Sequence, residues 1–179
     1  MLKKILLTLV TIIAIILVVG AFQAPTYHIT RSATISAPPA VIFAAVNDFH
    51  RWPEWSPWEK LDPTMKRTHE GAPAGVGASY SWEGNSEVGA GMMTITESKP
   101  AELIRIKLEF IKPMPGISPT EFTFQPAAGT TTVTWTMTGE KNYISKVVCM
   151  FMNMDKMVGG DFEKGLASLK ANAEAAVKK

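Results

Sequence analysis

Few residues of this 179-residue chain are spaced for catalysis. His28, His50 and His69 are isolated from one another, and only Asp48 stands close enough to His50 to orient its ring. Cys, His, Asp and Glu nowhere have the spacing of a metal site, so the sequence predicts no metal and no other cofactor. The glycine-rich phosphate loop and the serine elbow of hydrolases are also missing. We therefore expect binding rather than catalysis and assign no catalytic residue.

The residues that stand out are large and apolar. Trp52, Trp55 and Trp58 lie at a spacing of three and are interrupted by prolines, which predicts a short broken helix or a tight loop. More bulky side chains alternate with polar ones further along the chain. The candidate ligand-binding residues are Trp52, Trp55, Tyr80, Trp82, Phe110, Phe122, Phe124, Trp135, Met137, Met150 and Met154. Such a set either fills an ordinary core or lines an apolar cavity, and both interpretations stay open.

Alternation of apolar and polar residues predicts the strands that carry most of these side chains. The pattern occupies residues 29–35, 79–83, 92–96, 104–110, 121–124 and 132–138. Turn residues such as Gly84-Asn85 and Pro126–Gly129 separate the segments. One apolar and one polar face on each strand indicate an antiparallel sheet that needs a single covering element.

Helical patterns flank this series of strands. Pro38 and Pro39 suit the first turn of a short helix, for which Ser36 is the expected N-cap. Near the C-terminus, Asp161 is expected to begin a long amphipathic helix just after Gly159-Gly160. A long helix against one face of a curved antiparallel sheet predicts an α+β protein of the helix-grip type.

Several of these segments resemble the START-like, Bet v 1-like superfamily, also called SRPBCC or the polyketide cyclase/dehydrase type. The matching stretches are Ile35–Phe43, Val46–Pro63, Tyr80–Asn85 and Phe162–Lys170. Together they run from about Arg31 to Glu174. The resemblance implies the helix-grip fold and favours an apolar cavity between sheet and C-terminal helix. It implies no particular ligand, because members of the superfamily bind different apolar molecules.

The N-terminus predicts a location. Residues 5–22 carry no charge, and as a helix they would cover roughly 27 Å, close to the ~30 Å hydrocarbon core of a bilayer. A cleaved signal peptide is the rival interpretation, with a small-residue site at Val19-Gly20-Ala21. However, the apolar run exceeds the usual length of about 7–15 residues. Lys3 and Lys4 precede the run, so we predict a single-pass protein whose domain lies outside the cytoplasm, on the periplasmic side in a Gram-negative cell.

The expected organisation has three parts: a transmembrane anchor at residues 1–24, a short tether at 25–30 and one helix-grip domain at 31–179. Lys3 and Lys4 account for the whole net charge of +2, so the domain itself is neutral. It has no basic stripe, which argues against nucleic acid as a partner. The single cysteine, Cys149, allows no internal disulfide and is expected to be a buried, inert thiol.

Residues 143–158 form the second unusual segment, because apolar side chains spread around most of the predicted helix. Methionines in this segment are flexible and suit surfaces that admit varied apolar partners. The helix is either a buried connector or a lid over the cavity mouth that dips into the membrane interface. Arg31 points inward by its parity on the first strand, and exposure beyond the sheet edge is the expected explanation.

The sequence therefore predicts membrane-tethered binding of a lipid-like or other hydrophobic small molecule. Two alternatives stay open. A cyclase, hydratase or hydrolase acting on an apolar substrate needs an ionisable group in the cavity, and Arg31, Tyr80, Asp48 and His50 are the candidates. The other alternative is a chaperone-like interaction module, because co-chaperones of the resembling superfamily hold a protein partner with this fold.

Overall fold

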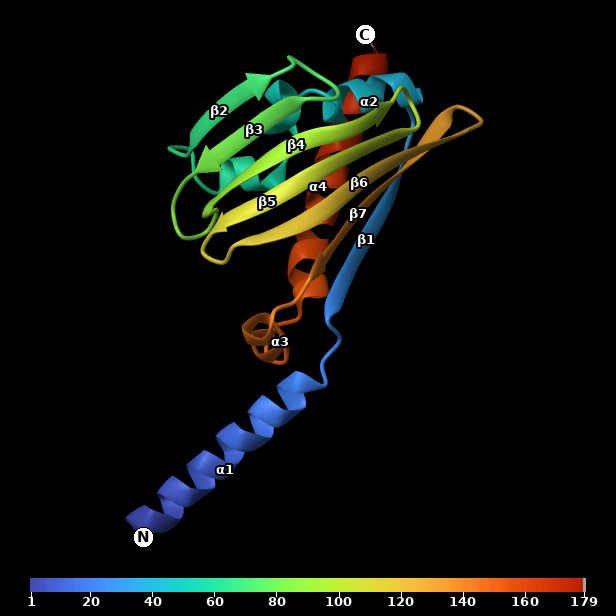
Figure 1. Ribbon diagram of the computed structural model, residues 1–179. Helices are drawn as coiled ribbons and strands as arrows, with labels where there is room; N and C mark the ends of the chain where they lie inside the picture. The colour runs from blue at the N-terminus through green and yellow to red at the C-terminus, as the bar shows by residue number, and fades with distance from the viewer. Residues whose placement is uncertain (179) are drawn as a thin grey trace.

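The computed structural model describes residues 1–178. A long N-terminal helix leads into one domain, in which a curved sheet wraps around the C-terminal helix (Figure 1). The elements are α1 (Leu2–Ala21), β1 (Thr26–Ile35), α2 (Pro39–Val46), η1 (Phe49–Glu54), η2 (Pro57–Lys60), β2 (Lys66–Gly71), β3 (Ala78–Glu83), β4 (Ala90–Lys99), β5 (Leu103–Lys112), β6 (Gly116–Ala127), β7 (Thr130–Glu140), α3 (Tyr143–Cys149) and α4 (Met154–Val177).

All seven strands form a single antiparallel sheet in the order β1-β7-β6-β5-β4-β3-β2. Consecutive strands are neighbours except at one point, where β1 pairs with the last strand, β7. Buried and less buried residues alternate along β7, as expected for one face packed on a core and one face in water. This arrangement confirms the predicted α+β, helix-grip class, with α4 as the covering element (Figure 1).

Two details of the strands differ from the sequence prediction. β2 (Lys66–Gly71) was not predicted, because an edge strand without large apolar residues shows no alternation of hydrophobicity. β1 begins at Thr26, inside the stretch expected to be a tether, and pairs with Glu140 at its first residue. Only residues 22–25 therefore connect α1 to the sheet.

The centre of the core is a stack of aromatic rings between the sheet and α4. Trp135 of β7 lies parallel to Phe162 of α4 with ring centroids 4.0 Å apart, and it also stacks on Phe122 at 4.7 Å. A side chain at Gly165 would meet the Trp135 ring at 3.0 Å, so the glycine allows α4 to approach the stack closely. This packing fixes how deeply the helix sits in the sheet.

The C-terminal helix begins earlier than predicted. α4 starts at Met154, where the side chain of Asn153 accepts a hydrogen bond from the backbone N–H of Lys156. The prediction that it begins at Asp161 was therefore wrong, and Gly159-Gly160 lies inside the helix. Glycine disfavours a helix interior by about 1 kcal/mol relative to alanine, but here tertiary contacts outweigh that preference.

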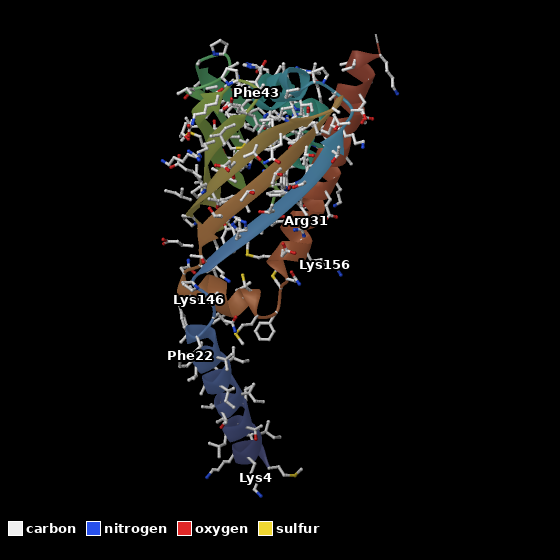
Figure 2. All side chains as sticks on the ribbon, turned by 90° about the vertical axis from the view of Figure 1, so that its right-hand side faces the viewer. Lys4, Phe22, Arg31, Phe43, Lys146 and Lys156 are labelled. Carbon is white, nitrogen blue, oxygen red and sulfur yellow. The ribbon has the colours of Figure 1, made fainter. Side chains whose placement is uncertain are left out.

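Arg31 explains the position of Gly159. Its guanidinium donates hydrogen bonds to both carboxylate oxygens of Asp155 at 3.0 Å and to Glu163 at 2.7 Å. A Cβ at Gly159 would collide with that guanidinium. The expectation that Arg31 extends past the sheet edge was wrong, because its partners on α4 hold it against the helix (Figure 2).

This contact predicts opposite effects for two adjacent glycines. We expect Gly159→Ala to lower the Tm, because the new methyl displaces Arg31 from Asp155 and Glu163. Gly160→Ala is the matched control: nothing lies within 4 Å of its Cβ position, and the change should stabilise α4 by up to about 1 kcal/mol. Thermal unfolding of the full chain in detergent measures both. Equal Tm values for the two variants would refute the packing argument.

The same contact depends on pH. The hydrogen bond from Arg31 lowers the pKa of Asp155 below its ordinary value of about 3.9. Stabilisation from a carboxylate with a lowered pKa is complete above the ordinary value and is lost as the pH falls through the lowered one. The Tm deficit of Gly159→Ala should therefore be constant around neutrality and shrink only in strong acid.

A further correction concerns residues 143–158, which were expected to form one continuous helix. The structure breaks this segment between Cys149 and Met154, so α3 and α4 are separate helices. α3 packs against the end of α1: the Tyr143 hydroxyl donates to the Leu17 carbonyl at 2.6 Å, and Val147 covers Gly20. Figure 2 shows Phe22 and Lys146 close together at this junction, with Lys4 at the far end of α1.

Candidate ligand-binding cavity

A cavity of about 270 Å³ lies between the sheet and α4. It reaches the β3–β4 and β5–β6 turns and the first turns of α4, which all lie at the end of the domain nearest α3 and α1 (Figure 1). Its wall is largely apolar, formed by Trp52, Trp58, Met65, Tyr80, Trp82, Val88, Met93, Leu108, Phe110, Pro113, Trp135, Met137, Val158 and Phe162.

The tryptophan segment supplies one side of this wall. Trp52 lies in the 3₁₀ helix η1, Trp55 follows the end of that helix, and Trp58 lies in the second 3₁₀ helix, η2. All three rings pack on the core: Trp52 on Phe122, and Trp55 and Trp58 on Trp135. The indole N–H of Trp52 donates to the Val46 carbonyl, and that of Trp55 donates to the Ala45 carbonyl. These bonds satisfy the polar edges of two rings whose apolar faces are buried.

Six of the residues singled out by sequence line the cavity, namely Trp52, Tyr80, Trp82, Phe110, Trp135 and Met137. Trp55, Phe122 and Phe124 are buried in the surrounding core and do not border the empty space. Met150 and Met154 border a separate hollow between β1 and the connection from α3 to α4. The structure thus brings Trp52 of η1 and five candidates of the sheet to the cavity wall, and it places Met150 and Met154 elsewhere.

One buried carboxylate lies in the apolar wall, and the sequence did not predict it. The side chain of Glu59 is only 5% exposed. It accepts a hydrogen bond of 2.5 Å from the Tyr80 hydroxyl and one of 2.7 Å from Nε of Arg67. Burial, together with the bond to Glu59, raises the pKa of Tyr80, so its hydroxyl stays protonated near neutral pH. The same carboxylate raises the pKa of the Arg67 guanidinium.

Most of the catalytic candidates from the sequence lie outside the cavity. Arg31 is held on α4, and Asp48 accepts a hydrogen bond from the His50 ring at 2.8 Å near the start of η1. The His50 ring stacks on that of His69 at 4.2 Å, and neither lines the cavity. Tyr80 alone among the four candidates borders it. Within residues 1–178, no group of three or more His, Cys, Asp or Glu side chains could hold a metal ion.

A curved antiparallel sheet closed by a long C-terminal helix over an apolar cavity defines a helix-grip protein of the SRPBCC type. The chain belongs to the family described as polyketide cyclase / dehydrase and lipid transport, whose model matches residues 26–174. This membership supports hydrophobic ligand binding at the level of the family. Among curated proteins, none matches this chain.

Solved structures with the same fold are distant in sequence. A protein from Chromobacterium violaceum is 19% identical, with a TM-score of 0.61 over 82% of this chain and 96% of its own. The di-domain ARO/CYC StfQ from the steffimycin biosynthetic pathway is 10% identical, with a TM-score of 0.65 over 87% of this chain and 53% of its own. The Aha1 dimer from Colwellia psychrerythraea is 18% identical, with a TM-score of 0.55 over 83% of this chain and 96% of its own. At these identities the likeness shows the fold alone.

Proposed function

We propose that this protein binds a lipid-like or other hydrophobic small molecule in its cavity while α1 tethers it to a membrane. The observation that carries the proposal is the cavity itself, about 270 Å³ with an almost entirely apolar wall. Moving an apolar molecule from water into such a site gains about 25 cal/mol for each Å² removed from water. The volume is near the small end of ligand pockets, which run from about 300 to 1,000 Å³.

The membrane tether rests on α1. Its 20 residues would cover about 30 Å, and Gly20 is its only buried residue, so the other side chains are available to lipid. Lys3 and Lys4 stand at the end remote from the domain, which under the positive-inside rule favours a cytoplasmic N-terminus. We accordingly propose an anchor within residues 1–24, residues 22–25 as the short connection to β1, and a domain beyond it that faces away from the cytoplasm.

The contact between α1 and α3 orients the cavity toward the proposed bilayer. With α1 in the bilayer, the bond from Tyr143 to Leu17, inside the last turns of α1, would bring α3 to the level of the membrane surface. Large apolar side chains are exposed on the same end of the domain, in the α3 region and on the β5–β6 turn: Ile111, Met114, Ile117, Ile144, Val148, Phe151 and Met152. α3 adds no residue to the cavity wall, so we assign it to the membrane interface rather than to a lid.

The test is native mass spectrometry of the full chain, released gently from the membrane fraction of its source cell. We expect a stoichiometric hydrophobic adduct that solvent extraction recovers. Leu108→Trp, which fills the cavity from β5, should remain in the membrane fraction and lose the adduct. Recovery of the unprocessed chain in the soluble fraction would refute the tether. A clean unliganded mass from the membrane fraction, with no thermal shift on adding lipids, would refute binding.

A further inference from the structure

The polar part of the cavity has a definite hydrogen-bonding character. Glu59 and Tyr80 line the wall and are 5% and 3% exposed, so water does not solvate them freely. Two further charged side chains, Glu87 and Lys112, line the cavity beside the turns, and Lys112 is paired with Glu83 at 2.8 Å. Glu59 is therefore the buried charge that an apolar ligand would meet inside the cavity.

This pair of residues can only accept further hydrogen bonds. An ionised carboxylate offers about four acceptor positions, and Glu59 uses one oxygen for Tyr80 and the other for Arg67. The Tyr80 hydroxyl has already donated its single proton to Glu59, so only its acceptor capacity is left. Ser56, also in the wall, carries a hydroxyl that adapts to either role. A ligand group that complements the Glu59–Tyr80 pair must therefore donate a hydrogen bond.

Arg67 does not turn this region into an anion site. Its Nε donates to the Glu59 carboxylate, one terminal nitrogen donates to the Met65 carbonyl at 2.9 Å and the other to the Glu59 carbonyl at 3.3 Å. The guanidinium is thus bound to the protein through all three nitrogens, and it does not line the cavity. An anionic head group placed beside Glu59 would meet a like charge in a poorly solvated site.

From this geometry we propose that the cavity selects apolar molecules whose polar end is a neutral hydrogen-bond donor, an alcohol in the simplest case. Molecules of the same length that end in a carboxylate are rejected. The inference rests on the proposed function, and it names the chemical class of ligand that the same cavity takes. Selection arises from the accepting pair at one end and from the apolar wall along the remainder.

The tryptophans supply a direct measurement. All five lie in the domain, and Trp52, Trp58, Trp82 and Trp135 line the cavity. We would titrate the full chain, in phosphatidylcholine nanodiscs, with undecanol and undecanoate that carry bromine at the tail, at a pH where the acid is ionised. Bromoundecane serves as the ligand without a head group. Bromine quenches nearby indole fluorescence, so the half-quenching concentration reports occupancy of the cavity.

The alcohol should half-quench at a concentration at least about tenfold lower than the carboxylate, the equivalent of one pKa unit of interaction. Glu59→Gln removes the charge and adds an N–H donor, so it should reduce the preference to less than about threefold. Tyr80→Phe keeps the ring and should weaken binding of the alcohol without changing binding of the other two ligands. Glu121→Gln is the matched control: it changes the exposed Arg105–Glu121 pair, whose 2.8 Å contact is similar, and should keep the full preference.

The outcomes separate this inference from the proposed function. Similar quenching by alcohol and carboxylate, unchanged in Glu59→Gln and Tyr80→Phe, would overturn the selectivity and leave apolar binding standing. Tighter binding of the carboxylate would overturn it as well. The absence of quenching by all three ligands, bromoundecane included, would overturn both the selectivity and the cavity's role in binding.

Discussion

Trp135→Ala is expected to lower the free energy of unfolding by about 3–5 kcal/mol, the usual range for removing a large buried aromatic side chain. Trp135 is only 2% exposed, and its ring contacts Phe162 and Phe122 on its two faces. The deletion would leave a void between β7 and α4 that the backbone cannot close, since Gly165 already brings α4 close to the ring. Denaturant titration of the full chain in detergent, followed by circular dichroism, measures the loss.

The matched control for this change is Trp82→Ala. Trp82 also lines the cavity, but it belongs to β3, is partly exposed, and its aromatic neighbours are Tyr80 and Phe110 of the sheet. Its removal should cost distinctly less stability while enlarging the cavity on the side of the edge strands. If both alanine variants lost the same free energy of unfolding, the stack of Phe122, Trp135 and Phe162 would not be the structural centre that we describe.

Arg67→Ala should be destabilising by about 2–4 kcal/mol, because it leaves the Glu59 carboxylate buried without its cationic partner. The side chain of Arg67 is 25% exposed, so water can enter the space that this side chain leaves. That water solvates part of the Glu59 charge and offsets part of the loss of stability. We expect Glu59→Gln to rescue the variant: the double change should be more stable than Arg67→Ala alone, since no charge is then left buried. Thermal unfolding of the unchanged protein, the two single variants and the double variant measures these differences as a double-mutant cycle.

An exposed pair of the same chemistry provides the control. Arg105, on the outer face of the sheet, contacts Glu121 at 2.8 Å and also Glu97, and its side chain is half exposed. Arg105→Ala should barely change the Tm, because water solvates the two carboxylates after the arginine is gone. Equal losses for Arg67→Ala and Arg105→Ala, or no rescue by Glu59→Gln, would show that burial of Glu59 does not control stability.

The sheet was predictable because most of its strands have one solvent-exposed face and one buried face. Residues 132–138 alternate threonine with larger apolar residues, and the structure buries the apolar set on β7. β2 was not predicted, because its residues from Lys66 to Gly71 lie at an edge of the sheet and contribute no large apolar side chain. Periodicity therefore identifies strands that build the core and misses strands that only extend it.

The candidate site was predictable only in part, for a related reason. Tyr80 and Trp82 point inward by parity, so their place in the wall followed from the strand pattern. Glu59 lies in a short 3₁₀ helix, where no period predicts orientation, and its role depends on Tyr80 and Arg67 of two other elements. The place of Gly159 inside α4 likewise depends on a distant residue, because Arg31 occupies the space beside it and pairs with Asp155 and Glu163. Long-range partners of this kind leave no local signal in one sequence.

The short connection between α1 and β1 limits how this protein could deliver a ligand. Residues 22–25 reach at most about 14 Å when fully extended, and the bond from Tyr143 to Leu17 shortens the range of motion further. Under the proposed function, the domain could not travel between two membranes with its cargo. Ligand would enter and leave at one bilayer surface, and onward transport would require a second, diffusible acceptor to come to that surface.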